Sequence, residues 1–290
     1  MNKENGSGLH TPIGFIGAGN MAEAMISGLV RTNTLSPGLI RAADPSSERR
    51  AYIADMYGVE AETDNLPVVQ QCPIVVFAVK PQQMASVVSD LSARNAFEAP
   101  YRKLVISVAA GVTIASFEKW IYEGLPDHHR HRIAIVRVMP NTPALVGEGI
   151  SAYSASAAAS PEDLSNTRRI LGAMGESLHC EESRMNAVTA VSGSGPAYCF
   201  YFLEAVAAAG EKLGLTEEEA EKLAVATFRG SLRLLDVQKE KPAVLRGKVT
   251  SPGGTTEAAI RVFDDAGVRR AIMEAVGAAA RRASELSAAG

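Results

Sequence analysis

The glycine-rich stretch at residues 13–22, IGFIGAGNMA, constrains the fold of this chain more than any other part of the sequence. A short β-branched and aromatic run leads to Gly17, and an Ala-rich helical pattern continues to Leu29. This is the G-x-G-x-x-G/A pattern found where the first strand of a dinucleotide-binding unit turns into a helix. Gly17 permits the tight turn, Gly19 lets the backbone approach a pyrophosphate, and Ala22 lets the helix pack against the strand. Unpaired N–H groups at the helix start would then bind the phosphates, although a purely structural glycine turn is the alternative.

The composition narrows the class of protein. With 290 residues, of which 47% are hydrophobic, the chain is expected to form two domains with a sizeable core. The 29 basic and 32 acidic residues leave a net charge of −3, which predicts neither a nucleic-acid partner nor a basic membrane-binding surface. Residues 1–10 are polar, lack the apolar core of a signal peptide and are expected to form a flexible leader. Cys72, Cys180 and Cys199 lie far apart in apolar contexts, which predicts buried, reduced thiols of a cytoplasmic protein.

Strand and helix patterns alternate from residue 11 to about residue 180. Further strands are expected at 38–44, 73–79, 104–108, 133–139, 149–154 and 176–180, with helices between them. This alternation predicts an α/β fold, with a doubly wound Rossmann-like domain at 11–180. Beyond residue 181 the strand signal disappears, and helices are expected at 196–213, at 217–237, up to 263 and at 268–286, with a loop at Pro242. Residues 181–290 are therefore predicted to form an all-α domain.

Capping residues mark where several of these helices begin. Ser, Thr, Asp and Asn are favoured there because their side chains accept a hydrogen bond from an unpaired backbone N–H. The predicted caps are Ser46 or Ser47, Asp64 or Asn65, Thr113, Ser160 and Thr216.

Several predicted strands are followed directly by a glycine, a polar residue or a tight turn. These positions are Gly17, Asp44, Lys80, Ala109 and Asn141. Ligands of open α/β sheets bind outside the carboxyl ends of the strands, so these residues are predicted to line one cofactor crevice. The loop around Asn141 has a proline on either side, and its stiffness suits either a ligand contact or a rigid connection.

Asp44 follows the second predicted strand, about 20 residues after the glycine-rich turn. An acidic side chain there can bind the adenosine ribose of NAD, although a plain turn residue is the alternative. Arg49 and Arg50 follow closely and could instead serve the ribose phosphate of NADP. The sequence therefore leaves the choice between NADPH and NADH open.

A second glycine-rich loop lies at residues 250–256, TSPGGTT. Gly253 and Gly254 allow successive N–H groups to point one way, and Thr255 and Thr256 stand at the start of a helix. With the hydroxyl of Ser251, the loop is predicted to form a nest for a small anion, with a carboxylate as the first candidate. A similar Gly/Ser turn at 192–196 precedes the long apolar helix, and Thr189 lies one helical turn before it.

The helix expected at 196–213 is apolar nearly all round and should be buried. A helical domain of this size has little room to bury it alone, which indicates a homodimer, with burial against the first domain as the alternative.

The histidines at 128, 129 and 131 belong to a polar run and predict no metal site. Ser194 lacks the spacing of a nucleophile and has no evident Asp/His pair.

Taken together, the motifs make the chain similar to the pyrroline-5-carboxylate reductase family over residues 13 to about 286. The resemblance rests on GFIGAGNMA (14–22), AVKP (78–81), RVMPNTP (137–143), SGSGPAY (192–198) and VTSPGGTT (249–256), which occur in the family's order. It implies the reduction of 1-pyrroline-5-carboxylate to L-proline by NADPH or NADH, the last step of proline biosynthesis. It also implies a helical dimerisation domain, with dimers often assembled into larger rings.

The resemblance implies a role for individual residues as well. Cofactor-binding positions would be Gly17, Gly19, Asn20, Met21, Asp44, Asn65, Ala78, Lys80, Pro81 and Asn141. Substrate-binding positions would be Ser251, Gly253, Gly254, Thr255 and Thr256, which hold the carboxylate. Thr189 would approach the ring nitrogen as the catalytic residue.

Two other functions are compatible with a Rossmann domain followed by helices. A β-hydroxyacid dehydrogenase would need a catalytic lysine in the second domain, and neither Lys212 nor Lys222 lies in a recognisable context. A dinucleotide sensor without turnover would have no need of the carboxylate loop at 250–256. The sequence does not indicate the oligomer size beyond a dimer, the proton donor to the ring nitrogen, or regulation by proline.

Overall fold

The computed structural model describes residues 9–123 and 125–289, so the predicted leader lies mostly outside the described residues. The chain divides into two compact units. The first contains the residues up to Gly193 together with 279–290, and the second is Ser194–Ala278. Each is described by itself below.

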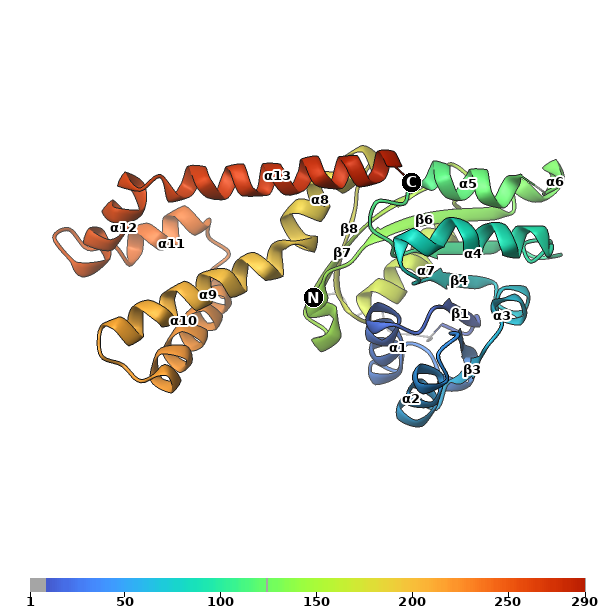
Figure 1. The fold of residues 1–290 in the computed structure, drawn as a ribbon, viewed down its shortest axis with the longest axis horizontal. Helices are drawn as coiled ribbons and strands as arrows, with labels where there is room; N and C mark the ends of the chain where they lie inside the picture. The colour runs from blue at the N-terminus through green and yellow to red at the C-terminus, as the bar shows by residue number, and fades with distance from the viewer. Residues whose placement is uncertain (1–8, 124, 290) are drawn as a thin grey trace. The chain divides into compact units, whose positions relative to one another are not determined.

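A sheet of eight strands in the order β3-β2-β1-β4-β5-β6-β7-β8 forms the centre of the first unit (Figure 1). The strands are β1 (Ile13–Ile16), β2 (Ile40–Ala43), β3 (Glu60–Glu62), β4 (Ile74–Phe77), β5 (Lys103–Ser107), β6 (Ile133–Met139), β7 (Gly149–Ala155) and β8 (Gly175–His179). The chain order reverses between β1 and β4, which is the switch point of a doubly wound sheet. The predicted α/β class and the predicted strands are confirmed, and the short edge strand β3 was not predicted.

The sheet differs from a wholly parallel one at β7, which runs antiparallel to β6. The connection between these strands contains only the short 3-10 turn Thr142–Val146. A parallel return needs a crossover of roughly a dozen residues or more, whereas an antiparallel neighbour needs only a short loop. β8 then pairs parallel with β7.

Helices cover both faces of the sheet. They are α1 (Asn20–Arg31), α2 (Ser47–Tyr57), α3 (Asn65–Gln71), α4 (Pro81–Ala93), α5 (Ile114–Tyr122), α6 (Asp127–Arg130), α7 (Pro161–Gly172) and α8 (Met185–Val188). The predicted caps Ser46, Asp64, Thr113 and Ser160 are confirmed, since each side chain accepts a backbone N–H of its own first turn.

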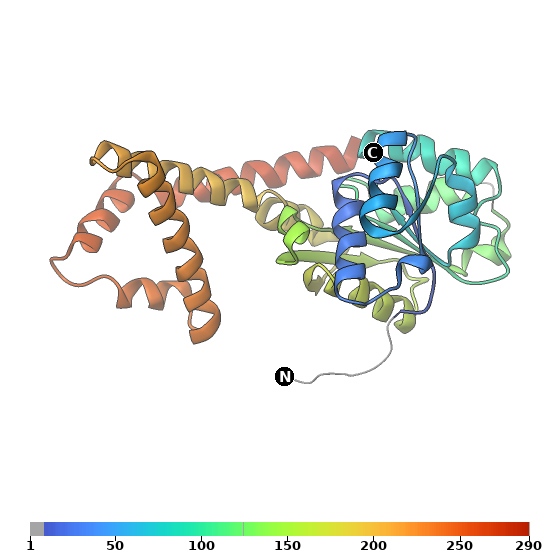
Figure 2. The same cartoon turned by 90° about the horizontal axis from the view of Figure 1, so that it is seen from below.

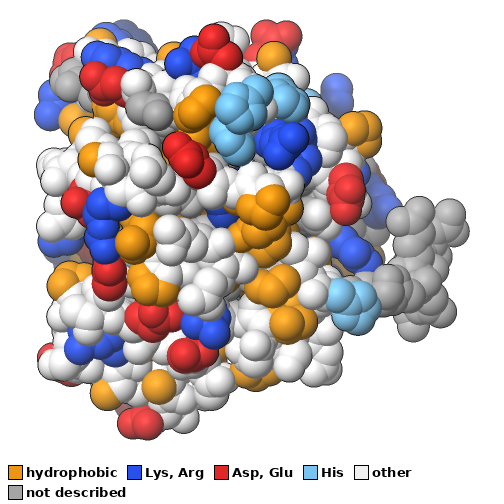
Figure 3. Space-filling model, turned by 90° about the vertical axis from the view of Figure 1, so that its right-hand side faces the viewer, with side chains coloured by type: hydrophobic (Ala, Val, Ile, Leu, Met, Phe, Trp, Pro, Cys, Tyr) orange, Lys and Arg blue, Asp and Glu red, His pale blue; other side chains and the backbone are white. Residues whose placement is uncertain are grey.

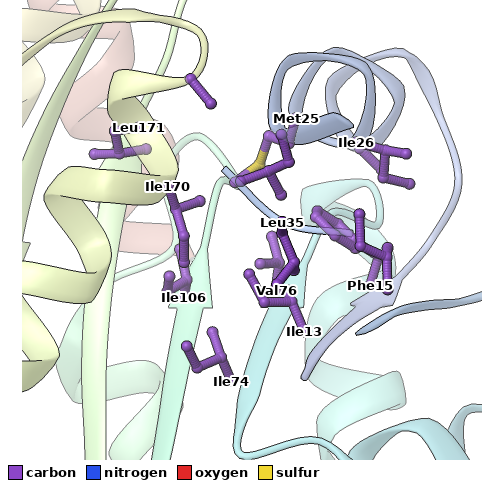
Figure 4. Packing of buried hydrophobic residues seen from close by; sticks show 14 of the residues in the cluster. Ile13, Phe15, Met25, Ile26, Leu35, Ile74, Val76, Ile106, Ile170 and Leu171 are labelled. Carbon is purple, nitrogen blue, oxygen red and sulfur yellow. The ribbon is translucent and has the colours of Figure 1, made fainter. Parts of the chain in front are cut away.

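The hydrophobic core has one layer on each side of the sheet. On one face, α1, α2 and α7 pack on alternate residues of the central strands, and Phe15, Met25 and Ile170 are fully buried there (Figure 4). On the other face, α3, α4 and α5 pack on the intervening residues, and Phe77 and Phe117 meet edge to face with centroids 5.5 Å apart. Burial on both faces explains why the central strands are continuous apolar runs.

The second unit is wholly helical in its described residues (Figure 2). It contains α9 (Gly195–Lys212), α10 (Glu217–Gln238), α11 (Pro242–Lys248), α12 (Thr255–Asp265) and the start of α13 (Val268–Ala289). Thr216 forms the expected capping box with Glu219. The loop predicted at Pro242 is wrong, because this proline takes the first position of α11, where its missing N–H has no consequence.

One burial prediction, that for the cysteines, needs correction. Cys72 is buried, but Cys180 and Cys199 are only partly buried. In α9, Phe200 and Tyr201 are 60% and 70% exposed in the single chain, so burial of this helix by a second copy stays a prediction. No helix in the described part of the chain combines the length and the apolarity that crossing a membrane requires.

Candidate functional site: a dinucleotide crevice and a separate anion loop

The predicted crevice residues gather at one edge of the sheet. Strands β1, β2, β3, β4, β5 and β6 are mutually parallel, so their carboxyl ends share that edge. The residues that follow these ends are Gly17, Asp44, Asn65, Ala78, Lys80, Pro81, Ala109 and Asn141. The edge includes the switch point between β1 and β4, where dinucleotides bind in such sheets.

Gly17 is required by both conformation and packing. Its φ is +91°, a region that L side chains rarely adopt. A Cβ atom would also lie 3.0 Å from the carbonyl carbon and oxygen of Ala78, at the end of β4. The turn after β1 therefore packs closely against the end of β4.

Gly19 is different, because nothing in the chain's own structure requires a glycine there. Its φ is −71°, and a Cβ atom would meet no atom within 4 Å. It is the N-cap of α1, and no side chain caps this helix. No described residue accepts the N–H groups of Asn20, Met21 or Ala22. An open space above uncapped helical N–H groups fits a pyrophosphate, which the N–H groups and the helix dipole would hold.

Asp44 makes two backbone contacts that sequence reasoning did not find. Its Oδ2 accepts the N–H of Ala18, in the glycine-rich turn, at 2.8 Å. Its Oδ1 accepts the N–H of Ser46 at 2.8 Å. Asp44 therefore joins the end of β2 to the turn after β1.

The remaining crevice residues belong to helix starts and turns. Lys80 is exposed and is the N-cap of α4, with Pro81 at the first helical position. The side-chain oxygen of Asn141 accepts the N–H of Ile150 at 2.9 Å. Asn141 thus fastens the start of β7 to the end of β6, which supports the rigid connection without excluding a ligand contact.

Thr189 begins a π-helical turn, Thr189–Gly193, after α8. Such turns are rare and often occur at functional sites. The Thr189 hydroxyl donates to the carbonyl of Met185 at 2.8 Å. Gly193 packs closely on Met139, the last residue of β6, since a Cβ atom at Gly193 would lie 2.5 Å from the Met139 Cε. This contact places the turn at the carboxyl edge of the sheet, which no local sequence signal could have indicated.

The loop of the second unit differs from the predicted nest. The N–H of Gly253 donates to the carboxylate of Glu257 at 2.8 Å, and that of Gly254 donates to the Ser251 carbonyl at 3.0 Å. The N–H groups of the two glycines are therefore used inside the loop. The N–H groups that follow, those of Thr255 and Thr256, lie at the uncapped start of α12. No described residue accepts them. The anion site therefore stays a prediction, with the N–H groups at the start of α12 as its donors.

Histidine side chains gather beside basic and acidic ones on the surface around α6 (Figure 3). Of these, His128 and His131 are exposed. Within the described residues, no group of three or more His, Cys, Asp or Glu side chains is placed to hold a metal ion.

Comparisons with known proteins match both parts of the chain. The family model "NADP oxidoreductase coenzyme F420-dependent" matches residues 12–111, and "Pyrroline-5-carboxylate reductase dimerisation" matches residues 182–286. A pyrroline-5-carboxylate reductase of Synechocystis is 41% identical over 274 residues, covering 94% of this chain and 97% of its own length.

Solved structures give the same result. A pyrroline-5-carboxylate reductase of Coxiella burnetii superposes with a TM-score of 0.86 at 35% identity, covering 96% of this chain and 99% of the other. That of Plasmodium falciparum, solved with NADP bound, gives a TM-score of 0.83 at 28% identity, covering 97% of this chain and 100% of the other. The extent of these matches, which include both the dinucleotide crevice and the helical unit, shows that the chain belongs to the pyrroline-5-carboxylate reductase family.

Proposed function

We propose that this chain reduces 1-pyrroline-5-carboxylate to L-proline with NADPH or NADH, as the last step of proline biosynthesis. The observation that carries the proposal is the loop at Ser251 and Thr255, because a dinucleotide crevice alone does not identify the substrate. The uncapped start of α12 with its neighbouring hydroxyls suits a substrate carboxylate.

We assign cofactor binding to the carboxyl edge of the first unit. The free N–H groups of Asn20 and Met21 would hold the pyrophosphate, with Gly17 and Gly19 keeping side chains out of its way. Asp44 and Asn65 would contact the adenosine ribose. Ala78, Lys80 and Pro81 would line the nicotinamide ribose, and Asn141 would lie near the nicotinamide ring.

We assign substrate binding to Ser251, Gly253, Gly254, Thr255 and Thr256. The N–H groups of Thr255 and Thr256 and the hydroxyls supply the donors, while the two glycines give the loop its shape. Gly253 has a φ of +71°, which a glycine adopts without strain. Fixing the carboxylate determines which face of the ring is presented.

When bound, the reduced nicotinamide supplies a hydride to the carbon of the C=N bond. The π electrons of that bond move to nitrogen, and an imine that enters protonated becomes a neutral secondary amine that keeps its proton.

The role of Thr189 follows from its hydrogen bond. Its hydroxyl hydrogen is donated to the Met185 carbonyl, so its oxygen presents lone pairs. We therefore assign Thr189 as the acceptor of the imine N–H, which holds the protonated substrate in place, rather than as a proton donor.

The proposal is tested by following NADPH and NADH oxidation with 1-pyrroline-5-carboxylate. Turnover with the imine is expected with either nucleotide at saturation. A β-hydroxyacid dehydrogenase would instead reduce NAD⁺ or NADP⁺ with hydroxyacids, and a sensor would bind the dinucleotide without turnover. Absence of turnover with the imine contradicts the proposal.

We also propose that the functional form is a homodimer in the cytoplasm, with assembly of dimers into a ring as a further step. The support for the dimer is the match of residues 182–286 to a dimerisation family model and the exposed aromatic residues of α9. A hollow of about 430 Å³ in the second unit, lined by Tyr198, Tyr201 and Ile272 among others, is largely apolar and suits side chains of a second copy.

A further inference from the structure

Strand β6 contacts both ends of the segment that carries Thr189. Arg137 and Met139 are two residues apart in β6, so their side chains leave the strand on the same face. The Nη1 of Arg137 lies 3.2 Å from the Oε1 of Glu182, which begins the segment. Met139 packs against Gly193, which ends it. One face of β6 therefore holds the segment at two points, with Thr189 between them in the chain.

The segment consists of three short helical turns in direct succession. They are the 3-10 turn Glu182–Arg184, α8 and the π-helical turn Thr189–Gly193. The N–H of Thr189 donates to the carbonyls of Met185 and Asn186, so the π-helical turn continues from α8 without a break. Helical turns this short are not stable by themselves, since nucleating a helix is unfavourable. Contacts with the rest of the fold must therefore hold Thr189 in position.

The contact at the start of the segment is a buried ion pair. The side chain of Arg137 is 6% exposed, and that of Glu182 is 31% exposed. The same Glu182 oxygen accepts the N–H of Ile114 at 2.8 Å. Ile114 is the first residue of α5, where a backbone N–H has no acceptor within the helix. Glu182 thus joins β6 and α5 to the segment through one carboxylate.

Burial makes this contact selective for one position of the segment. An arginine out of water is costly without an anion, so a position that moves Glu182 away leaves the charge of Arg137 uncompensated. A pair of apolar side chains would tolerate such a shift, because apolar contacts are not directional. The best-attested use of a buried ionic group is to fix the register of the elements that it joins.

We propose that Arg137 and Glu182 are positioning residues, whose ion pair sets where the Thr189 oxygen stands relative to the carboxyl end of β6. The inference rests on the proposed function for the role of Thr189. β6 also leads to Asn141, which the proposed function places near the nicotinamide ring. One strand thereby aligns the acceptor of the imine N–H with the hydride donor, and hydride transfer depends steeply on such alignment. Arg137 and Glu182 act through Thr189 and not on the substrate itself.

A double-mutant cycle tests whether the pair acts through Thr189. Glu182→Gln keeps an oxygen for the Ile114 N–H but removes the charge that pairs with Arg137. It should lower kcat with the imine about tenfold and change KM less. In the Thr189→Ala background it should lower kcat by less than about twofold, because the residue to be positioned is absent. Equal losses in the two backgrounds overturn the inference.

The role of the Arg137 charge is tested by two substitutions and a control. Because the contact joins one nitrogen to one oxygen, Arg137→Lys should retain kcat within about threefold, whereas Arg137→Met should lower it about tenfold. Arg102→Met breaks another ion pair of a buried carboxylate, with Asp163 at 2.7 Å, and should lower the Tm without changing kcat. The same loss of kcat in Arg102→Met as in Arg137→Met would show that lower stability explains both, and would contradict the inference.

Hydrogen exchange of the full-length protein tests the position of the segment without imine. Backbone amides of residues 185–193 should exchange about tenfold faster in Glu182→Gln than in the wild type, whereas those of α4 should keep their rate. Unchanged exchange at 185–193 overturns the inference. Failure of the wild type to reduce the imine would overturn the proposed function, and the exchange rates would still decide whether the ion pair holds the segment.

Discussion

At the scale of single residues, the conformation and packing of the chain require a glycine at Gly17 but not at Gly19. Since its φ and its surroundings would accept a side chain, Gly19→Ala should fold with an unchanged Tm. The added methyl group would occupy the space above the uncapped N–H groups of α1, so the Kd for the dinucleotide should rise about tenfold or more.

Gly172, the last residue of α7, also has open space around it and provides the matched control. Gly172→Ala should leave the dinucleotide Kd unchanged. Normal binding by Gly19→Ala, measured by nicotinamide fluorescence, would show that this glycine has no role in the cofactor site.

Thr189 is the residue proposed to contact the imine nitrogen. In the proposed site the carboxylate loop binds the substrate, whereas the Thr189 oxygen orients the C=N bond towards the nicotinamide, so Thr189→Ala should lower kcat by roughly 10- to 100-fold and change KM less. Thr189→Ser keeps the hydroxyl and should retain most of the activity. Steady-state kinetics with the imine would refute the assignment if kcat were unchanged in Thr189→Ala.

Lys103, at the start of β5, is buried and has no carboxylate partner among the described residues. It donates to the carbonyls of Val69 and Cys72 at the end of α3, and it lies over the ring of Tyr101. Burial lowers the pKa of this ammonium from 10.5 to about 8, an effect only partly opposed by Cys72. Between these two values the unfolded chain binds the proton and the folded chain does not, so stability associated with Lys103 rises with pH.

Comparing the wild type with Lys103→Met isolates this effect from other titrating groups. The free energy of unfolding of the wild type, relative to the variant, should rise by about 1 kcal/mol per pH unit from pH 8 to 10. Lys119→Met, at an exposed lysine of α5, should show no such trend. A constant difference in urea titrations across this range would contradict the prediction.

At the scale of elements, several helices begin at a side chain that caps their first turn. The α7 capping box has Ser160 accepting the Asp163 N–H at 3.2 Å, while Asp163 accepts the Ser160 N–H at 2.8 Å and pairs with Arg102 at 2.7 Å. Ser160→Ala removes the first of these bonds and should lower the free energy of unfolding by about 1 kcal/mol.

Ser36 offers a comparison, because it precedes the 3-10 turn Pro37–Leu39 without making a side-chain cap. Ser36→Ala should change the stability by less than about 0.5 kcal/mol. Chemical denaturation of both variants tests whether the cap, rather than the serine, stabilises the helix.

At the scale of the whole molecule, the exposed aromatic residues of α9 indicate association. Tyr201 is 70% exposed, so Tyr201→Glu should not disturb folding of the chain itself but should weaken a dimer that covers this face. Analytical ultracentrifugation should show a shift towards monomer at low protein concentration. Met56→Glu changes an apolar residue of α2 that is 60% exposed, and should leave association unchanged. An unaltered dimer in Tyr201→Glu would exclude this face of α9 from the interface.

Local sequence patterns were sufficient to predict the features that depend on neighbouring residues. Strand ends, helix caps and both glycine-rich loops are local patterns, since hydrophobic periodicity and capping act over a few residues. They were enough to predict the doubly wound sheet, the helical unit and the common edge of Gly17, Asp44 and Asn141. The same local reasoning failed at Pro242, where a proline is compatible with both a loop and the first position of a helix.

The distant group that satisfies each donor and acceptor could not be predicted, because it depends on how the whole chain folds. Asp44 and Arg49 both contact Ala18, although they lie 26 and 31 residues away in the chain. The packing of Gly193 on Met139 and the antiparallel turn into β7 are likewise long-range outcomes. A sequence shows that a polar group needs a partner, but the partner depends on how the whole chain packs, because a buried polar group without one is costly. The cofactor fold could therefore be predicted from local pattern, whereas the contacts that Asp44 and Arg49 make with the glycine-rich turn form only in the folded chain.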